Sequence, residues 1–328
     1  LDGKVLMLLF SAHQRMTPSA SSPRPELIIG LVGATGTDFE TVTSSLRVAL
    51  SVVGYELEVV HIIELLKTFS HFASLPDSPL EVKVEARMDA GDEFCRLLDC
   101  GDALARMAMG RILHLRSERT GDAGTPASSV AYVLRSLKRK EEVELLRAVY
   151  GANFLLIGAF APRPVRIDSL AMRIAQSHHA ASGDDYRDKA ERLVQRDLND
   201  QSKRWGQHVG DTFHLADFFV NVTDPSALSN AIERFIKMLF GYQFHTPNKD
   251  EYGMFHAHAA ALRSASLGRQ VGAAITTSDG AIVAVGTNDV PKAGGGQYWE
   301  GDQPDKRDHT FQRDASDMVR RGMLAEVL

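Results

Sequence analysis

The turn from Gly33 to Asp38 has the residue types and spacing to hold a phosphate group. It follows the apolar run LIIGLV and precedes a helix-favouring segment. In such a strand–turn–helix unit, backbone N–H groups and the helix start point at one anion. A P-loop also needs lysine after its second glycine, and here the turn has Thr37 and Asp38. Two interpretations stay open: a nucleotide phosphate held by the turn, or a tight turn without a ligand. The candidate phosphate-binding residues are Gly33, Ala34, Thr35, Gly36 and Thr37.

An arginine-rich stretch forms a second group of residues that could bind phosphate. Its members are Arg163, Arg166, Arg173, Arg187, Arg192 and Arg196. Guanidinium groups bind phosphate oxygens through paired N–H donors. Arginines on a helix are also typical of a solvated face, so a phosphate clamp and a solvated surface both remain open.

A third group lies between Asp250 and Trp299, where RQVGAA and GTNDVP stand at the ends of two short strand-like runs. Asn288 is a candidate ligand contact, although Asn-Asp before a proline is a good turn by itself. Arg269 and Lys292 are candidate phosphate partners or surface ion pairs. Tyr298 and Trp299 offer stacking faces or core anchors, and the sequence does not separate the two.

The histidines and cysteines do not form a recognisable metal site. His256 and His258 are two apart on a predicted helix, so they point about 200° apart and cannot chelate one ion. The only cysteines, Cys95 and Cys100, are too few for a disulfide framework and suit a reducing cytoplasm. We therefore expect no metal ligand set in this chain.

The elements that must position these residues predict two domains, for which 328 residues are enough. Continuously apolar runs indicate strands buried on both faces of a parallel sheet with flanking helices. The predicted strands are 27–32, 57–62, 154–160 and 218–222, and helices are predicted at 141–150 and, after the start signal Asp224-Pro225, at 227–239.

The second domain is predicted to begin with a helix and a β-hairpin. The helix runs from an Asp250 N-cap to Gly268, with a stripe of Tyr252, Phe255, Ala259 and Leu262. The strands are 270–276 and 281–287, joined by a Ser-Asp-Gly turn. We place an N-terminal arm at 1–25, the first domain at 26–245 and the second at 246–328.

These segments resemble two known families. Residues 26–241 resemble small P-loop nucleotide kinases in the glycine turn, in YVLRSLKRKEEVELLRAVYG, in the arginine stretch and in DTFHLADFFVNVTDP. The RQVGA and GTNDVP motifs resemble deoxycytidylate deaminases. Together they resemble the two-domain deaminases of bacterial anti-phage defence, which implies a P-loop kinase-like α/β domain followed by the first helix and hairpin of a cytidine deaminase-like α/β/α domain.

The resemblance implies a zinc-dependent hydrolase that deaminates dCTP or dCMP, with Asn288 on the sugar and the first domain in a regulatory or architectural role. It also implies a homo-oligomer and control by an RNA or protein regulator. Deamination needs an H-x-E and a P-C-x-x-C signature, and neither occurs here. We therefore expect the zinc ligands to lie beyond Leu328.

Two other functions remain open from the sequence. One is a catalytically incomplete, nucleotide-regulated binding or scaffold protein, and the other is a nucleotide kinase, against which the missing lysine argues. The net charge of -5 gives no reason to expect nucleic-acid binding over the whole surface. No apolar run approaches the ~20 residues of a membrane span, so we expect a cytoplasmic protein.

Overall fold

The computed structural model describes residues 24–198, 206 and 208–327. The contacts divide the chain into two compact units that meet at Gly241 and Tyr242. Each unit is described by itself below. The predicted N-terminal arm falls almost wholly outside the described residues. None of the helices in the described part of the chain combines the length and apolar character of a membrane span.

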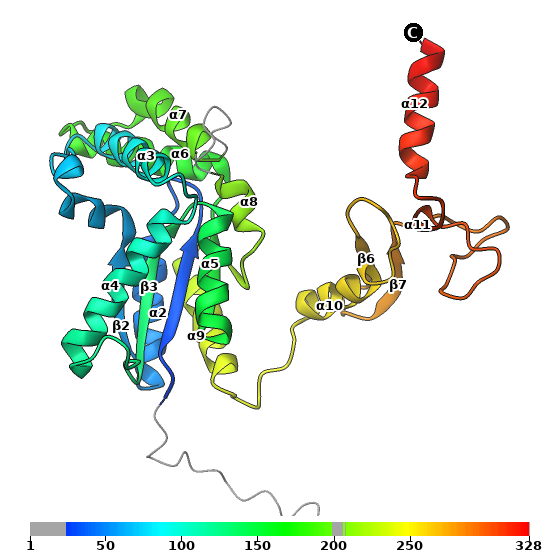
Figure 1. Ribbon diagram of the computed structural model, residues 1–328, viewed down its shortest axis with the longest axis horizontal. Helices are drawn as coiled ribbons and strands as arrows, with labels where there is room; N and C mark the ends of the chain where they lie inside the picture. Colours follow the sequence, from blue (N-terminus) through cyan, green and yellow to red (C-terminus); the bar gives the residue numbers. More distant parts are fainter. Residues whose placement is uncertain (1–23, 199–205, 207, 328) are drawn as a thin grey trace, which may run out of the picture. The chain divides into compact units, whose positions relative to one another are not determined.

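The first unit is built on a five-stranded parallel sheet in the order β2-β3-β1-β4-β5 (Figure 1). Its strands are β1 (Leu27–Val32), β2 (Glu56–His61), β3 (Val130–Leu137), β4 (Phe154–Phe160) and β5 (Phe218–Asn221). All six residues of β1 are buried. A strand with apolar side chains on both faces belongs in the middle of such a sheet, and β1 lies between β3 and β4.

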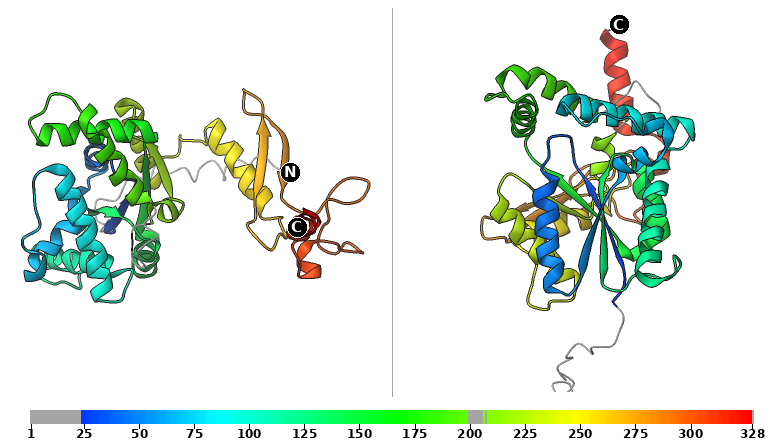
Figure 2. Two further views of the ribbon diagram at one scale, coloured as in Figure 1. Left: turned by 90° about the horizontal axis from the view of Figure 1, so that it is seen from above. Right: turned by 90° about the vertical axis from the view of Figure 1, so that its left-hand side faces the viewer.

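Helices cover both faces of this sheet (Figures 1 and 2). One face packs against α2 (Phe39–Val52) and α9 (Pro225–Leu239), and the other packs mainly against α4 (Ala103–Thr120) and α5 (Lys140–Tyr150). A third group closes over the carboxyl ends of the strands: α3 (Leu80–Leu97), α6 (Arg163–Ser177) and α7 (Arg187–Leu198). Shorter pieces are the 3-10 helices η1 (Ile62–Thr68), η2 (Ser70–Phe72), η3 (Gly151–Asn153) and η4 (Asp184–Tyr186), and α8 (Val209–Phe213).

The pairing of β1 with β3 contains a β-bulge close to the ends of both strands. Leu31 lies opposite Arg135 and Val32 lies opposite Leu137, so Ser136 has no partner on β1. An extra residue in one strand reverses the alternation of the side chains that follow it. Leu137 accordingly packs in the same cluster as Leu134, on the face covered by α4 and α5.

The predicted α/β class of the first domain is confirmed. All four predicted strands and both predicted helices form, with bounds shifted by at most two residues. The sequence prediction located four of the five strands and missed β3, although its sequence, VAYVLRSL, is almost as apolar as the others. Asp224 caps α9, because its carboxylate accepts the backbone N–H groups of Ser226 and Ala227.

The second unit contains α10 (Lys249–Ala261) and an antiparallel hairpin of β6 (Gly272–Thr276) and β7 (Ile282–Thr287). It ends with α11 (Asp308–Phe311) and α12 (Ala315–Val327). The helix and hairpin were predicted, but the helix bounds were wrong. Asn248, not Asp250, is the N-cap, since its side chain accepts the Glu251 N–H and Glu251 returns a bond to the Asn248 N–H.

All four side chains of the predicted apolar stripe are exposed. The buried positions of α10 are Gly253 and Ala257, and α10 packs on β6. The contact is close enough that a Cβ on Gly272 would overlap the carbonyl oxygen of Ala257 and the amide nitrogen of Ala261. Small residues therefore set the distance between this helix and the hairpin.

Candidate functional site

The strand order creates a crevice between the carboxyl ends of β1 and β3. The chain leaves β1 into α2 on one face of the sheet, whereas it leaves β3 into α5 on the opposite face. Adjacent parallel strands whose following helices lie on opposite faces mark a topological switch point, and ligands of open α/β sheets bind there. The predicted glycine turn follows β1 directly and therefore lies at this crevice.

The conformation of the turn requires glycine at position 36. Gly36 has φ +90°, and a Cβ there would come within 2.7 Å of the carbonyl oxygen of Arg166. The carboxylate of Asp38 caps α2 by accepting the backbone N–H groups of Glu40 and Thr41. The acidic residue at the end of the turn therefore has a structural role in the helix. Thr37 is 5% exposed, and its hydroxyl has no hydrogen-bond partner in the described part of the chain.

A carboxylate from α7 reaches the turn. Asp197 is fully buried, and its Oδ2 accepts the backbone N–H of Thr35 at 2.5 Å. The Nζ of Lys138 lies 2.9 Å from the same carboxylate and donates to the carbonyl oxygen of Gly33 at 3.1 Å. A backbone N–H and a lysine ammonium thus hold one anion at the turn. The lysine that the turn lacks in its own sequence comes from the residue after β3.

Arg166 lies on the other side of the turn. It is 7% exposed and donates to the carbonyl oxygens of Ala161 at 3.1 Å and of Thr35 at 3.3 Å. Burial lowers the pKa of Arg166 from its usual value, and the nearby carboxylate of Asp197 acts in the opposite direction. Arginine remains protonated at neutral pH. Two cations therefore accompany the single buried carboxylate.

A cavity of about 390 Å³ extends from the turn between the strand ends and α3. Volumes of this order are usual for small-molecule sites. Its described lining contains one acidic side chain, Glu64, and six basic ones: Lys83, Arg87, Arg135, Lys138, Arg139 and Arg173. The same lining has an apolar wall that includes Phe39, Ile62, Ile63, Val84, Met88 and Leu104. Burial, followed by the charge of Arg135, lowers the pKa of His61 in this lining. Five of these basic side chains are paired with carboxylates: Lys83 and Arg87 with Asp77, Arg135 with Glu40, Lys138 with Asp197 and Arg139 with Asp92. An anionic ligand with an apolar or planar part would therefore have to compete with these carboxylates.

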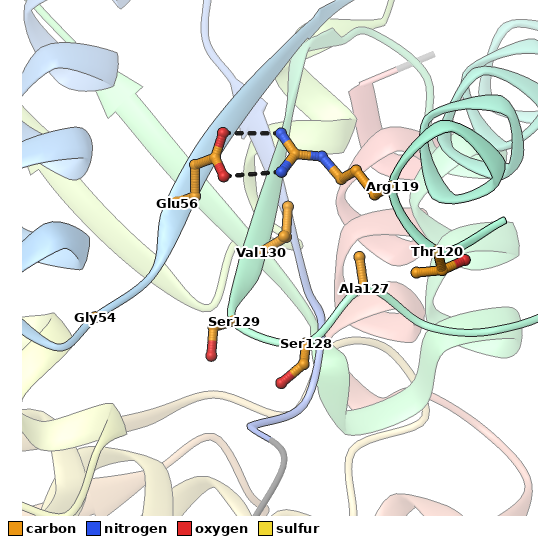
Figure 3. Close-up of a pocket in the computed structure, with 8 residues that line it drawn as sticks. All are labelled: Gly54, Glu56, Arg119, Thr120, Ala127, Ser128, Ser129 and Val130. Carbon is orange, nitrogen blue, oxygen red and sulfur yellow. Dashed lines mark hydrogen bonds and ion pairs between the residues drawn. The ribbon is translucent and has the colours of Figure 1, made fainter.

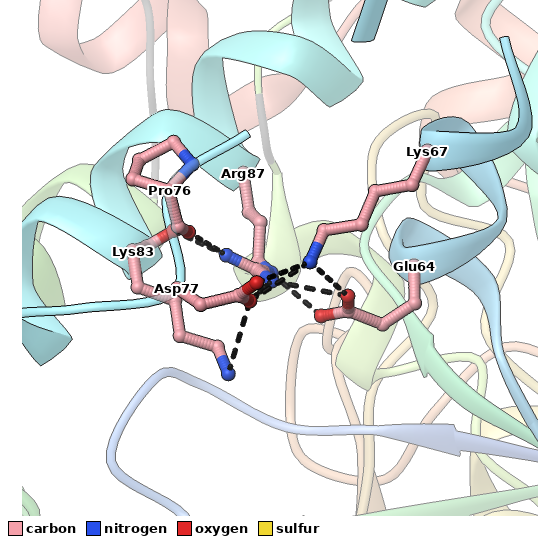
Figure 4. A network of polar contacts seen from close by, with 6 residues as sticks. All are labelled: Glu64, Lys67, Pro76, Asp77, Lys83 and Arg87. Atoms are coloured by element: carbon pink, nitrogen blue, oxygen red, sulfur yellow. Dashed lines mark hydrogen bonds and ion pairs between the residues drawn. The ribbon is translucent and has the colours of Figure 1, made fainter. Parts of the chain in front are cut away.

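A polar network supports the wall of the cavity formed by η1 and α3 (Figure 4). Arg87 is nearly buried and makes two bonds to Glu64, at 2.6 and 3.0 Å. It also donates to Asp77 at 2.8 Å and to the carbonyl oxygen of Pro76 at 2.7 Å. Lys67 and Lys83 complete the network around Asp77. Arg87 is thereby committed to holding the wall together.

A second hollow of about 360 Å³ lies near the opposite ends of β2 and β3 (Figure 3). Arg119, the basic residue of its described lining, makes two bonds to Glu56, at 2.8 and 2.9 Å. The guanidinium is thus already neutralised by a neighbouring carboxylate. This hollow is a weaker candidate than the cavity at the turn.

The six arginines of the predicted clamp divide into two groups. Arg163, Arg187 and Arg196 pair with Glu191, Asp168 and Asp89 respectively, and Arg192 donates to the carbonyl oxygen of Asp188. Arg166 contacts the turn, and Arg173 lines the cavity. The stretch is therefore largely a set of ion pairs between helices, and two of its members face the site.

In the second unit, Asn288 connects the segment before β6 to the end of β7. Its Oδ1 accepts the N–H of Val271 at 2.7 Å and the hydroxyl of Ser264 at 2.9 Å, and its Nδ2 donates to the carbonyl oxygen of Arg269 at 2.7 Å. The side chain of Arg269 is exposed, and Lys292 pairs with Asp302 at 2.5 Å. All polar atoms of Asn288 are used within the unit, and contact with a sugar stays a prediction.

Trp299 and Arg263 form a feature that the sequence left undecided. The guanidinium of Arg263 stacks 3.6 Å from the centroid of the Trp299 ring, which is 58% exposed. Trp299 is thus a stacking face rather than a core anchor. A separate hollow in the second unit is lined by this pair and by His256. Among the described residues, no three His, Cys, Asp or Glu side chains gather as metal ligands, and the implied zinc finds no site there.

Comparisons with known proteins found weak structural similarities. No family model and no curated protein matches the sequence. Similar solved structures include a protein of the PezAT toxin-antitoxin system of Streptococcus pneumoniae (TM-score 0.31, 13% identity, 53% of this chain and 61% of that one). Others are a fructose transport system kinase from a Silicibacter species (0.31, 15%, 66% and 97%) and a gluconokinase from Sinorhizobium meliloti (0.30, 14%, 68% and 100%).

These comparisons correct the predicted enzyme class. Two of the three similar structures are kinases by name, and kinases are transferases, whereas we predicted a hydrolase. None of the three is a deaminase by name. The assignment as a deoxycytidine nucleotide deaminase is wrong on this comparison. TM-scores near 0.3 provide no substrate and no mechanism for this chain.

Proposed function

We propose that the first unit binds a nucleotide at the crevice between β1 and β3, with a phosphate group at the Gly33–Thr37 turn. The observation that carries this proposal is the position of the Asp197 carboxylate. It accepts from Thr35 N–H and pairs with Lys138, which is how a phosphate oxygen would be held. The turn thus already acts as an anion site within the protein.

The rest of the cavity supports a nucleotide over a bare phosphate ion. Ion-paired basic side chains and Arg173 line the cavity beside the turn, and an apolar wall continues beyond it. A base or sugar has somewhere to lie once the phosphate is at the turn. This proposal follows the nucleotide-regulated binding protein considered from the sequence. Homo-oligomerisation and control by an RNA or protein partner remain predictions.

Phosphoryl transfer is a second candidate function, favoured by Lys138. Its Nζ supplies to the turn, from another element, the cation that a P-loop carries in its own sequence. Transfer of phosphate from labelled ATP to nucleoside monophosphates by the full chain tests this function directly.

Binding is tested by calorimetry of the full chain with inorganic pyrophosphate and with MgATP. We expect saturable binding with one site per chain. Because Lys138→Met alone leaves Asp197 buried without its cation, the informative pair is D197N against K138M/D197N. Loss of Lys138 in that background weakens pyrophosphate binding tenfold or more. Lys140→Met, an exposed lysine two residues away, leaves affinity unchanged. Absence of saturable binding in both wild type and D197N contradicts the proposal.

A further inference from the structure

We infer that Asp197 is an internal anion that occupies the phosphate position of the turn, so that a ligand binds by displacing the end of α7. This inference rests on the proposed function. Asp197 and Thr35 are 162 residues apart, and the contact joins the last turn of α7 to the turn after β1. It is therefore made by tertiary structure rather than by local chain geometry.

One position cannot hold both anions. The Thr35 N–H and the Lys138 Nζ each donate to the same carboxylate oxygen, Asp197 Oδ2. A phosphate oxygen that takes these donors leaves Asp197 without them. A carboxylate and a phosphate within hydrogen-bond distance of each other are both negatively charged and repel strongly in a buried site. Ligand binding and the contact of Asp197 with the turn are therefore mutually exclusive.

The charges favour exchange of one anion for another over simple opening. Lys138 and Arg166 are both largely buried beside the turn. If Asp197 left alone, these cations would lose their buried counterion, which is costly. An incoming phosphate restores the balance. The site therefore remains closed until an anion of sufficient charge competes for it.

Release of Asp197 also affects α3, which forms part of the cavity wall. The preceding residue, Arg196, pairs with Asp89 at 2.7 Å and with Asp92 at 3.4 Å, and both carboxylates belong to α3. Adjacent residues of α7 thus hold the turn and α3 at the same time. Movement of the α7 end links occupancy of the turn to the position of α3.

Affinity measurements on the full chain with inorganic pyrophosphate test the inference. Asp197→Asn keeps the shape of the side chain and removes its charge, so the fraction of binding-competent protein rises. We expect tenfold or greater tightening in D197N. The control is Asp188→Asn, an exposed position on the same helix with the same change in charge, which leaves affinity unchanged.

Hydrogen exchange on the wild-type chain provides a second, independent readout. Saturating pyrophosphate slows amide exchange in the peptide that contains Gly33–Thr37 and accelerates it in the C-terminal half of α7. If D197N binds no tighter than wild type, or if pyrophosphate protects both peptides together, the displacement is wrong while nucleotide binding stands. If no variant binds pyrophosphate, the proposed function fails and the displacement fails with it.

Discussion

Lys138 and Asp197 form an ion pair at 2.9 Å in which the carboxylate is fully buried, although 59 positions separate the two residues. The pair joins the end of β3 to the end of α7 and encloses the glycine turn between them. A buried charge is tolerated only with a partner and with hydrogen bonds, and Asp197 has both. The stability of the first unit and its proposed ligand chemistry thus depend on the same contact.

Removing the lysine of this pair should destabilise the protein. Lys138→Met leaves Asp197 buried without a cation, and we expect the free energy of unfolding to fall by about 3 kcal/mol. Urea denaturation followed by circular dichroism measures the change. The double variant K138M/D197N should recover most of the loss, and Lys140→Met should change stability by less than about 0.5 kcal/mol. Equal losses in the single and double variants would show that the charge is not the cause.

The Arg87 network should make stability depend on acid pH. Arg87→Ala removes the two bonds to Glu64 and the bond to the Pro76 carbonyl oxygen, at a cost of about 2 kcal/mol near neutral pH. Hydrogen bonds from Arg87 lower the pKa of Glu64, and those from Lys67, followed by Arg87, lower the pKa of Asp77 to about 2. Carboxylates whose pKa is lower in the folded state contribute stability above their unfolded pKa and lose it as the pH falls.

The difference in unfolding free energy between wild type and Arg87→Ala should therefore reach its full value above pH 4.5, the usual pKa of a glutamate such as Glu64. It should become smaller as the pH falls toward 2, the lowered pKa of Asp77. Urea denaturation across this range measures it. Arg106→Ala is the control, because Arg106 makes a similar paired contact with Asp102 but is itself exposed. Exposed pairs of this kind contribute little to stability because solvent screens them. A difference that does not depend on pH would argue against the network as its source.

The two thiols should differ sharply in reactivity. Burial raises the pKa of the Cys95 thiol to about 11, and its side chain is inaccessible. Because the thiolate is the reactive species, iodoacetamide at pH 8 should label Cys100 and leave Cys95 unmodified in the native protein. Peptide mass spectrometry locates the label, and Cys100→Ser should abolish it. Labelling of both thiols in urea confirms that folding protects Cys95, whereas rapid native labelling of Cys95 contradicts its burial.

The α10–β6 contact predicts different results for two glycines of the same hairpin. Gly272→Ala introduces a Cβ that overlaps the backbone of α10, and backbone cannot move aside as a flexible side chain can, so we expect a loss of about 3 kcal/mol. Gly286→Ala meets nothing within 4 Å and should cost well under 1 kcal/mol. Trp299 fluorescence in a W205F background follows unfolding of this unit. Similar stabilities for the two variants would show that the close contact is absent in solution.

The sequence located several of the elements but did not locate the site. Uninterrupted apolar runs located four strands of the first unit. Helical periodicity and the Asp-Pro start signal located two of its helices, because these are local patterns. Lys138 lies 105 positions from Gly33, and Asp197 lies 162 from Thr35, so their meeting depends on strand order and helix packing. The basic run directly after VAYVLRSL was the available signal for a cation at a strand end. Motif resemblance in the second unit led to a wrong enzyme class, since a helix and a hairpin do not define a reaction.

The bulge at Ser136 has a consequence for how this site could be altered. Side chains beyond it, including Lys138, occupy the positions they do because β3 carries one residue more than its partner strand. Deleting Ser136 would keep every charged residue of the cavity in the sequence, yet would turn the end of the strand over and direct the ammonium group away from the turn. The charge at the crevice is therefore encoded by the number of residues in a strand as well as by their identities. A scan of single substitutions would overlook this dependence, and a one-residue deletion would reveal it.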